Sequence, residues 1–165
     1  MSQRAFVAVR SAFYATVFFG LWGWLALFVR RFDGALGLSL PTWTPVVSIL
    51  VMTFGFALTL ACVSSFAVEG RGTPAPVDPP RELVTAGPYR WVRNPMYLGG
   101  FAMLLGFALM HRSLAMALLA VGFLGFFHLF VVWYEEPHLG RKFGDAYLDY
   151  RRDARRWIPR RPLSR

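Results

Sequence analysis

The feature of this sequence that most constrains its fold is a set of long apolar stretches between charged segments. Residues 11–29 and 45–68 contain no Asp, Glu, Lys or Arg. A helix over residues 11–29 would be about 28 Å long, close to the thickness of the hydrocarbon core of a bilayer. Inside lipid, every backbone N–H and C=O must be bonded within its own segment, which a helix achieves. The sequence therefore predicts an integral membrane protein whose spans are helices.

A cleaved signal peptide is the alternative for residues 11–29. The stretch is long for the apolar part of a signal peptide, and no small-residue cleavage pattern directly follows it. We therefore interpret it as a retained first helix.

Two further apolar stretches, residues 96–110 and 114–134, are separated by His111, Arg112 and Ser113. The first would form about 22 Å of helix, which is short for an independent span. It is either one arm of a helical hairpin or a re-entrant segment, and we predict the hairpin. The chain is expected to form a single membrane domain, residues 1–165, with four transmembrane helices at about 11–29, 45–68, 96–110 and 114–134.

The tail that follows is highly charged but keeps apolar residues at helical spacing. Leu139, Phe143, Ala146, Tyr147 and Tyr150 would share one face of a helix over residues 137–152. Such a helix is typical of segments that lie on a membrane surface. The predicted fold class is therefore all-α and integral to the membrane, with about four transmembrane helices and a C-terminal amphipathic cytoplasmic helix.

The basic residues are distributed unevenly between the two sides of this predicted bundle. The chain has 18 Lys and Arg residues and a formal net charge of +9. With four spans, fifteen of the 18 fall on the side that holds both termini and residues 69–94, and three on the other. Cytoplasmic loops are enriched in Lys and Arg, so we expect both termini in the cytoplasm and the protein in the inner (plasma) membrane. Because the charges flank membrane spans, lipid headgroups rather than nucleic acids are their expected partners.

Residues 87–100 form the most distinctive polar segment, at the point where a loop enters the third apolar stretch. Pro95 suits the first turn of a helix, and Arg93 then stands at its N-terminus, where backbone N–H groups favour an anion. Glu135 and Glu136 end the last stretch on the same side of the membrane. Arginines, a helix N-terminus and two carboxylates together would bind a zwitterion such as an amino-acid moiety. A proline-punctuated turn with solvated carboxylates is the alternative.

Several other chemistries have no support in the sequence. His111, His128 and His138 lack metal-ligand spacing, so no metal site is predicted. Neither a phosphate-binding lysine loop nor a dinucleotide-binding glycine fingerprint is present. The single cysteine, Cys62, lies inside an apolar stretch and is interpreted as a packing residue.

Several short motifs occur together in the second half of the chain: Gly87-Pro88-Tyr89, Arg93-Asn94-Pro95-Met96-Tyr97, Glu135-Glu136 and Phe143-Gly144, with Tyr147, Tyr150 and Pro159. As a set they resemble the isoprenylcysteine carboxyl methyltransferases, a family of integral membrane enzymes. The match covers about residues 70–159, and its Asn-Pro-Met-Tyr and Tyr-Glu-Glu-Pro motifs are also similar to the phospholipid N-methyltransferases. The resemblance implies S-adenosylmethionine as cofactor, bound by the segments 81–100 and 135–159, and a lipophilic methyl acceptor.

The same resemblance implies roles for individual residues. Arg93 and Tyr97 would be catalytic and position the cofactor or the acceptor. The residues implied in cofactor binding are Arg81, Glu82, Leu83, Val84, Tyr89, Asn94, Pro95, Met96, Tyr97, Glu135 and Glu136. The chain departs from the eukaryotic members at Asn94, where they have His, and at Val131, where they have an Arg that resembles a substrate-contacting group. The second departure argues against a prenylcysteine carboxylate as the acceptor.

The sequence therefore predicts an S-adenosylmethionine-dependent membrane methyltransferase that acts on a lipid-like or membrane-partitioned acceptor, similar to the isoprenylcysteine carboxyl methyltransferases. Two alternatives stay open: a phospholipid amine N-methyltransferase, and a non-catalytic membrane scaffold or lipid-binding protein. Cofactor binding separates the enzymes from the scaffold. The acceptor group, whether carboxylate, thiol or amine, separates the enzymes from each other.

Overall fold

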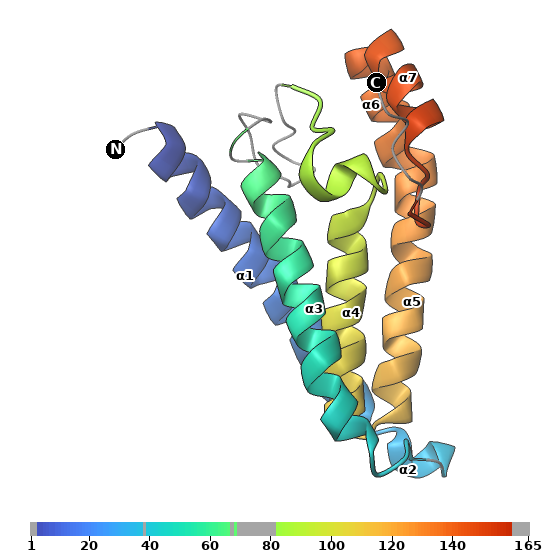
Figure 1. The fold of residues 1–165 in the computed structure, drawn as a ribbon. Coiled ribbons are helices and arrows are strands. Elements are labelled where there is room, and N and C mark those ends of the chain that lie inside the picture. The colour runs from blue at the N-terminus through green and yellow to red at the C-terminus, as the bar shows by residue number, and fades with distance from the viewer. Residues whose placement is uncertain (1–2, 38, 67, 69–81, 160–165) are drawn as a thin grey trace.

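The computed structural model describes residues 3–37, 39–66, 68 and 82–159, and for residues 3–12 it describes the backbone alone. These ranges fold into helices without a β-strand. The longest helices form a bundle of α1 (Gln3–Arg30), α3 (Thr44–Ser65), α4 (Pro95–Met110) and α5 (Leu114–Phe130) (Figure 1). The predicted all-α membrane class is confirmed.

Three of the described helices are long and apolar enough to cross a membrane, over Phe13–Arg30, Thr44–Ser65 and Leu114–Phe143. The helix α4 has 16 residues and is shorter, yet it runs between the same two ends of the bundle as its neighbours (Figure 1). At its C-terminus, the Leu109 carbonyl accepts a hydrogen bond of 3.1 Å from the hydroxyl of Thr44, at the start of α3. The helices α4 and α5 therefore form a hairpin, as predicted.

Large apolar side chains are exposed on the outside of the bundle, as expected of a surface that faces lipid. Examples on α1, α3 and α5 are Val17, Leu21, Val46, Leu50, Phe54, Val121 and Phe126. Trp91 and Trp133 are exposed toward one end and Trp43 toward the other, which is typical of aromatic belts at the two membrane interfaces. From Leu114 to Trp133 the helix is about 28 Å long, close to the thickness of the hydrocarbon core of a bilayer.

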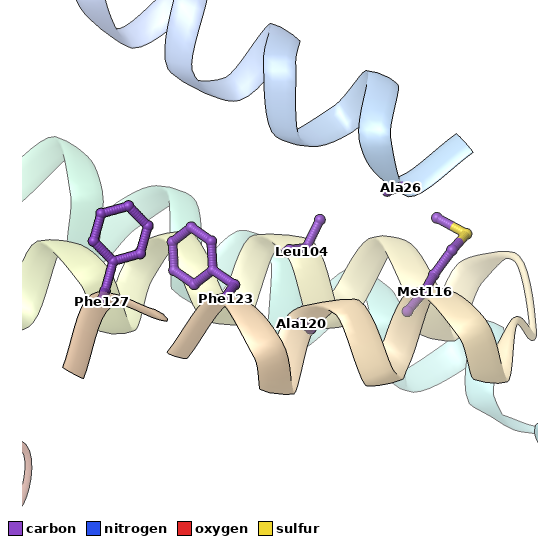
Figure 2. Close-up of a cluster of buried hydrophobic side chains, with 7 residues drawn as sticks. Ala26, Leu104, Met116, Ala120, Phe123 and Phe127 are labelled. Atoms are coloured by element: carbon purple, nitrogen blue, oxygen red, sulfur yellow. The ribbon is translucent and has the colours of Figure 1, made fainter. Parts of the chain in front are cut away.

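The main apolar core lies between α1, α4 and α5. Its buried side chains are Ala26, Leu104, Ala108, Met116, Ala120, Phe123 and Phe127 (Figure 2). The Trp22 ring of α1 meets the Phe123 ring edge-to-face at 4.8 Å between centroids, an arrangement that aromatic pairs prefer. This cluster attaches the first helix to the rest of the bundle.

A seam of small residues joins α3 to α4, the two helices that pack most extensively. A Cβ atom added at Gly55 would lie 2.7 Å from the Gly99 carbonyl oxygen. One added at Gly106 would lie 3.0 Å from the Met52 amide nitrogen. Only glycine leaves room for this approach, which is the ordinary use of small residues between membrane helices. The helix α3 thereby supports α4 along much of its length.

The structure differs from the sequence prediction near the N-terminus. The helix α1 begins at Gln3 rather than at residue 11, because no Gly or Pro interrupts residues 3–19. The loop predicted at residues 30–44 contains a short helix, α2 (Asp33–Leu36), which ends at Gly37 with a φ of 64°. A left-handed residue after the last turn is a common way to end a helix.

The structure also differs where the fourth span meets the tail. The helix predicted to end at Tyr134 continues through a π-helical turn, Val131–Glu135, into α6 (Glu136–Phe143). Pro137 lies in the first turn of α6, and the wider π-helical turn before it accommodates a residue without an N–H donor.

The prediction of a single tail helix over residues 137–152 is wrong. The structure has two helices there, α6 and α7 (Asp145–Asp153), which meet at Gly144. Gly144 has a φ of 53°, a conformation that glycine adopts far more readily than other residues, so the helical path turns there.

The two ends of the bundle have different compositions. We refer to residues 31–44 and 110–115 as the turn end, and to residues 82–97 and 128–157 as the site end. The helix α2 and the connection between α4 and α5 lie at the turn end (Figure 1). The start of α1 lies at the other end of the bundle, together with α6 and α7 (Figure 1).

Candidate active site

Prolines and a glycine shape the backbone of the site end. A 3₁₀ turn, Gly87–Arg90, has Pro88 in its first turn, and Pro95 opens α4 as the sequence predicts. Gly87 has a φ of 56°, and a Cβ atom there would overlap the hydroxyl of Ser65 on α3. The segment therefore passes closely over the end of α3 before it enters α4.

Glu136 lies at the centre of a cluster of arginines. Its side chain is 8% exposed, and its carboxylate accepts hydrogen bonds from Arg156 Nε at 2.8 Å and Arg156 Nη2 at 3.0 Å. Arg93 Nη2 lies 3.0 Å from the same carboxylate, and Arg151 Nη2 lies 3.9 Å from it. The hydrogen bonds to Glu136 raise the pKa of the Arg156 guanidinium above its ordinary value. A buried carboxylate needs such partners, because an unpaired charge in this position is strongly destabilising.

The same cluster joins two segments that are far apart in the sequence, the loop before α4 and the chain after α7. The Arg93 amide donates to the Arg155 carbonyl at 2.8 Å, and Val92 and Arg155 form an isolated parallel bridge. The Asn94 side-chain amide donates to the Arg156 carbonyl at 3.2 Å. The prediction that these two polar segments share one end of the bundle is confirmed.

Glu135, next to Glu136 in the sequence, has different partners. The Tyr97 hydroxyl donates to Glu135 Oε2 at 2.9 Å. In the part of the chain that the structure describes, the arginine ion pairs at this end go to Glu136 and Asp149, and none goes to Glu135. The two neighbouring carboxylates are therefore in different electrostatic surroundings.

Aromatic rings border the Tyr97–Glu135 pair. The Tyr97 ring stacks on Phe127 with centroids 4.5 Å apart and planes 21° apart. The Trp157 ring lies 6.5 Å from that of Tyr97, and its Nε1 donates to His128 Nδ1 at 2.9 Å. Ring faces and a carboxylate together attract cations. The tail thus adds an aromatic wall to the site.

A buried wall lies on the α3 side of the site. Val84 and Tyr89 pack against Cys62 of α3, and the Tyr89 carbonyl accepts a hydrogen bond of 2.8 Å from the Tyr150 hydroxyl of α7. Burial, followed by Cys62 and Glu135, raises the pKa of the Tyr89 hydroxyl well above its ordinary value. Met96, which precedes Tyr97 in α4, packs against the same cluster, so the wall lies beside the start of the helix that carries Tyr97.

Two features of this site fit a ligand that carries both positive and negative groups. Arg93 Nε is buried and has no hydrogen-bond partner among residues 82–159 and the other described ranges. Such an orphaned donor suits a carboxylate or hydroxyl oxygen of a ligand. Glu135 and the aromatic rings suit a sulfonium or ammonium group. These donors and acceptors match the cofactor that the sequence resemblance implies.

The structure brings most of the predicted site residues to the site end. Those found there are Glu82, Leu83, Val84, Tyr89, Arg93, Asn94, Pro95, Met96, Tyr97, Glu135 and Glu136. Within this set Glu82 is exposed and Leu83 is half-buried. Arg81 lies outside the described residues. Arg156 was missed by the sequence prediction, because nothing local distinguishes it from the other arginines of a basic tail.

An apolar cavity of about 140 Å³ lies deeper in the bundle. Its lining comes from α1, α3, α4 and α5: Phe18, Phe19, Trp22, Gly23, Met52, Gly100, Met103, Leu104, Phe107 and Phe123. Gly100 is about one helical turn from Tyr97, and the Phe123 ring lies 4.6 Å from the Phe127 ring. The cavity therefore lies about one helical turn from the Tyr97–Phe127 stack, and neither of these two rings lines it.

Comparison with known protein families identifies a match over much of the chain. A family model described as phospholipid methyltransferase matches residues 43–146. No curated protein and no solved structure matches the chain. The matched range covers α3 to α6 with the Tyr97–Glu135 pair, and it is more than half of the 165 residues. The chain therefore belongs to the phospholipid methyltransferase family, a family of integral membrane methyltransferases that includes members similar to the isoprenylcysteine carboxyl methyltransferases.

Proposed function

We propose that this protein is an S-adenosylmethionine-dependent methyltransferase whose acceptor is a lipid-like molecule in the bilayer. The observation that carries the proposal is the position of Glu135, bonded to Tyr97 beside aromatic rings and without an arginine partner among the described residues. Membership of a methyltransferase family supports the reaction type. The apolar cavity about one helical turn from the Tyr97–Phe127 stack supports a lipid-like acceptor.

When bound, S-adenosylmethionine supplies an electrophilic methyl group on a positively charged sulfur, which is displaced in line by a lone pair of the acceptor. Such a step depends on alignment and on the exclusion of water more than on a strong acid or base. On this chain, the Glu135 carboxylate and the ring faces of Tyr97 and Trp157 stabilise the positive charge. Arg93 Nε, a buried donor without a partner in the described residues, binds an oxygen of the cofactor.

The acceptor that the site favours is a phospholipid amine. A carboxylate acceptor needs a cation of its own beside the cofactor. Val131 is apolar and fully buried, the guanidiniums of Arg93 and Arg156 are paired with Glu136, and the free Nε of Arg93 is assigned to the cofactor. A protonated amine must lose its proton before it attacks. Glu135 Oε1, the oxygen that does not bond to Tyr97, would accept this proton and pass it to solvent, which leaves the carboxylate charged for the transfer step. The same carboxylate reduces the repulsion between an amine headgroup and a sulfonium. A phospholipid also places its headgroup at the depth of Glu135 and its chains beside the apolar cavity.

The proposed orientation puts the site end and both termini in the cytoplasm, in the inner (plasma) membrane. Fifteen of the 18 Lys and Arg residues fall on that side when the chain spans the membrane four times. The start of α1 and the helices α6 and α7 lie at one end of the bundle, which supports this arrangement (Figure 1). A cofactor and a headgroup would then meet at the cytoplasmic surface.

The test is a methyl-transfer assay with the purified protein in vesicles and S-adenosylmethionine radiolabelled in its methyl group. Separate vesicles contain phosphatidylcholine with phosphatidylethanolamine, phosphatidylcholine with a prenylcysteine, or phosphatidylcholine alone. We expect label in phosphatidylethanolamine and a large loss of transfer with Glu135→Gln. Arg152→Ala, which removes an exposed arginine paired with Asp149, is the matched control and should stay active.

Other outcomes of this assay contradict specific parts of the proposal. Label in the prenylcysteine alone would replace the amine by a carboxylate. Absence of transfer, together with no binding of S-adenosylhomocysteine to the folded protein, would favour a scaffold or lipid-binding role.

A further inference from the structure

Glu136 has no role in the proposed reaction, although several arginines of the site end surround its carboxylate. Its carboxylate binds Arg156 through two hydrogen bonds, at 2.8 Å and 3.0 Å, and lies 3.0 Å from Arg93. Arg93 precedes α4, whereas Arg156 follows α7. Because the carboxylate is buried, moving either arginine away would leave it without a full set of partners. Glu136 therefore couples the positions of two segments that no helix connects directly.

We propose that Glu136 is a positioning residue that holds the tail segment 154–157 against the loop before α4 and so closes the candidate site. Backbone contacts share this role, because the Arg93 amide donates to the Arg155 carbonyl at 2.8 Å. Ala154 is 1% exposed, as expected of a segment that is packed rather than loosely attached. These contacts are the evidence that the tail docks against the loop. The link between this docking and methyl transfer rests on the proposed function.

Closure of the site follows from the next residue of the tail. Trp157 directly follows Arg156, so a fixed Arg156 also fixes the Trp157 ring, which lies 6.5 Å from the ring of Tyr97. The Trp157 Nε1 bond to His128, at 2.9 Å, secures the ring from the other side. Without the Glu136 pairs, the site loses an aromatic wall and Arg93 loses the partner that orients its guanidinium. We therefore expect weaker cofactor binding with little change in the chemical step, because Tyr97 and Glu135 lie on the helices rather than on the tail.

Hydrogen exchange tests the docking itself. The Arg93 amide reports on the tail directly, because its hydrogen-bond acceptor is the Arg155 carbonyl. Exchange is measured in the full-length protein in detergent for the parent, Glu136→Gln and Arg156→Ala. Both variants should exchange at Arg93 at least about tenfold faster than the parent, because local opening sets the exchange rate. The matched control is Arg152→Ala, an arginine of the same tail that pairs only with Asp149 among the described residues, and it should exchange like the parent.

Ligand binding and turnover test the consequence for the site. Calorimetry with S-adenosylhomocysteine should show affinity about ten- to a hundredfold weaker for Glu136→Gln and for Arg156→Ala. The affinity of the double variant should be hardly lower than that of the single variant that binds more weakly, because both substitutions disrupt the same Glu136–Arg156 pair. Turnover at saturating S-adenosylmethionine should stay within about twofold of the parent, since the lost interactions act on binding. Arg156→Lys keeps the positive charge but loses the planar bidentate contact. Its affinity for S-adenosylhomocysteine should therefore lie between those of Arg156→Ala and the parent.

The outcomes separate a positioning role from a direct one. Weaker cofactor binding in Glu136→Gln without faster exchange at Arg93 would overturn the proposal and make Glu136 a cofactor contact. Parent-like exchange in both variants would also overturn it. If Glu136→Gln does not fold, Arg156→Ala decides the question, because its side chain is partly exposed and lies near the end of the chain. A parent protein that binds no cofactor would refute the proposed function, while the exchange experiment would still decide whether Glu136 docks the tail.

Discussion

The two ends of this helix bundle use their polar side chains in opposite ways. At the turn end, side chains bond to backbone groups. The Asp33 carboxylate accepts a hydrogen bond of 2.9 Å from the Ala115 amide, and Arg112 Nε donates to the Leu40 carbonyl at 3.0 Å. The Ser113 hydroxyl accepts from an amide in the first turn of α5. These bonds cap helices and close a connection.

At the site end, charged side chains bond mainly to each other. Arginines from three places in the sequence gather at Glu136, and the neighbouring Glu135 bonds to a tyrosine instead. The guanidinium of Arg93 keeps a buried nitrogen without a partner among the described residues. An unsatisfied buried donor costs stability, so a ligand that completes it gains binding energy. The polar side chains of the turn end therefore stabilise the fold, whereas those of the site end are the ones to which the proposed function assigns ligand binding.

The largest expected effect is a difference in cysteine labelling between the two ends, because they should lie on opposite sides of the membrane. Gly34→Cys at the turn end adds a side chain where nothing lies within 4 Å, and Asp149→Cys replaces an exposed residue of α7. In sealed vesicles, an impermeant maleimide should label one of the two cysteines from outside and the other only after the vesicles are opened. In inside-out vesicles, the outward-facing cysteine should be Asp149→Cys. Labelling of both from one side would contradict the four-span arrangement.

The next largest effect is expected from the Tyr97–Glu135 pair. Glu135→Ala should weaken S-adenosylmethionine binding about ten- to a hundredfold, because an ion pair between the carboxylate and the sulfonium is worth about 1.5–3 kcal/mol. Asp33→Ala is the matched carboxylate at the turn end and should leave the affinity unchanged. Calorimetry on both variants measures the difference. Equal losses of affinity at the two ends would mean that the substitutions act through general unfolding.

Overpacking the α3–α4 seam should affect both ends together, because the seam supports the helix that connects them. Gly55→Ala places a methyl group 2.7 Å from the Gly99 carbonyl oxygen and should destabilise the fold by about 1–3 kcal/mol. Gly122→Ala on α5 is the control, since nothing lies within 4 Å of its added Cβ, and it should stabilise the helix by up to about 1 kcal/mol. Thermal unfolding in detergent measures both. A parent-like melting temperature for Gly55→Ala would show that the helices can separate without cost.

The smallest effect is expected at the cap of α5. The buried Ser113 hydroxyl accepts a hydrogen bond of 3.1 Å from the Met116 amide, so Ser113→Ala should cost about 1 kcal/mol of stability. Cofactor affinity should not change, because the cap lies at the turn end. Thermal unfolding measures the stability of Ser113→Ala, and calorimetry measures its affinity for the cofactor. A loss of affinity larger than the loss of stability would show that the turn end also contributes to ligand binding.

Much of the bundle was predictable from residue type alone. The helices α3 and α4 begin within one residue of the predicted positions, and Pro95 opens α4 as its missing N–H donor suggests. The prediction failed where backbone geometry depends on the surroundings. The π-helical turn before Glu136 and the break at Gly144 reorient the tail, and neither has a periodic apolar pattern that would reveal it. The sequence also identified Arg93 and the two glutamates as a set without deciding how they pair.

The apolar helices follow from residue type, because a bilayer requires internally bonded segments, and the unequal distribution of Lys and Arg predicts that the basic loops share one side. The pairing at the site end, in which Glu135 bonds to Tyr97 while Glu136 binds Arg93 and Arg156, depends on the three-dimensional packing. Adjacent residues of a helix point about 100° apart, so one of the two had to face a different neighbour. Which one does so depends on the rotation of the helix after Val131 and on the position of Arg156. Both are set by packing between segments that are distant in the sequence, so no local pattern encodes the choice.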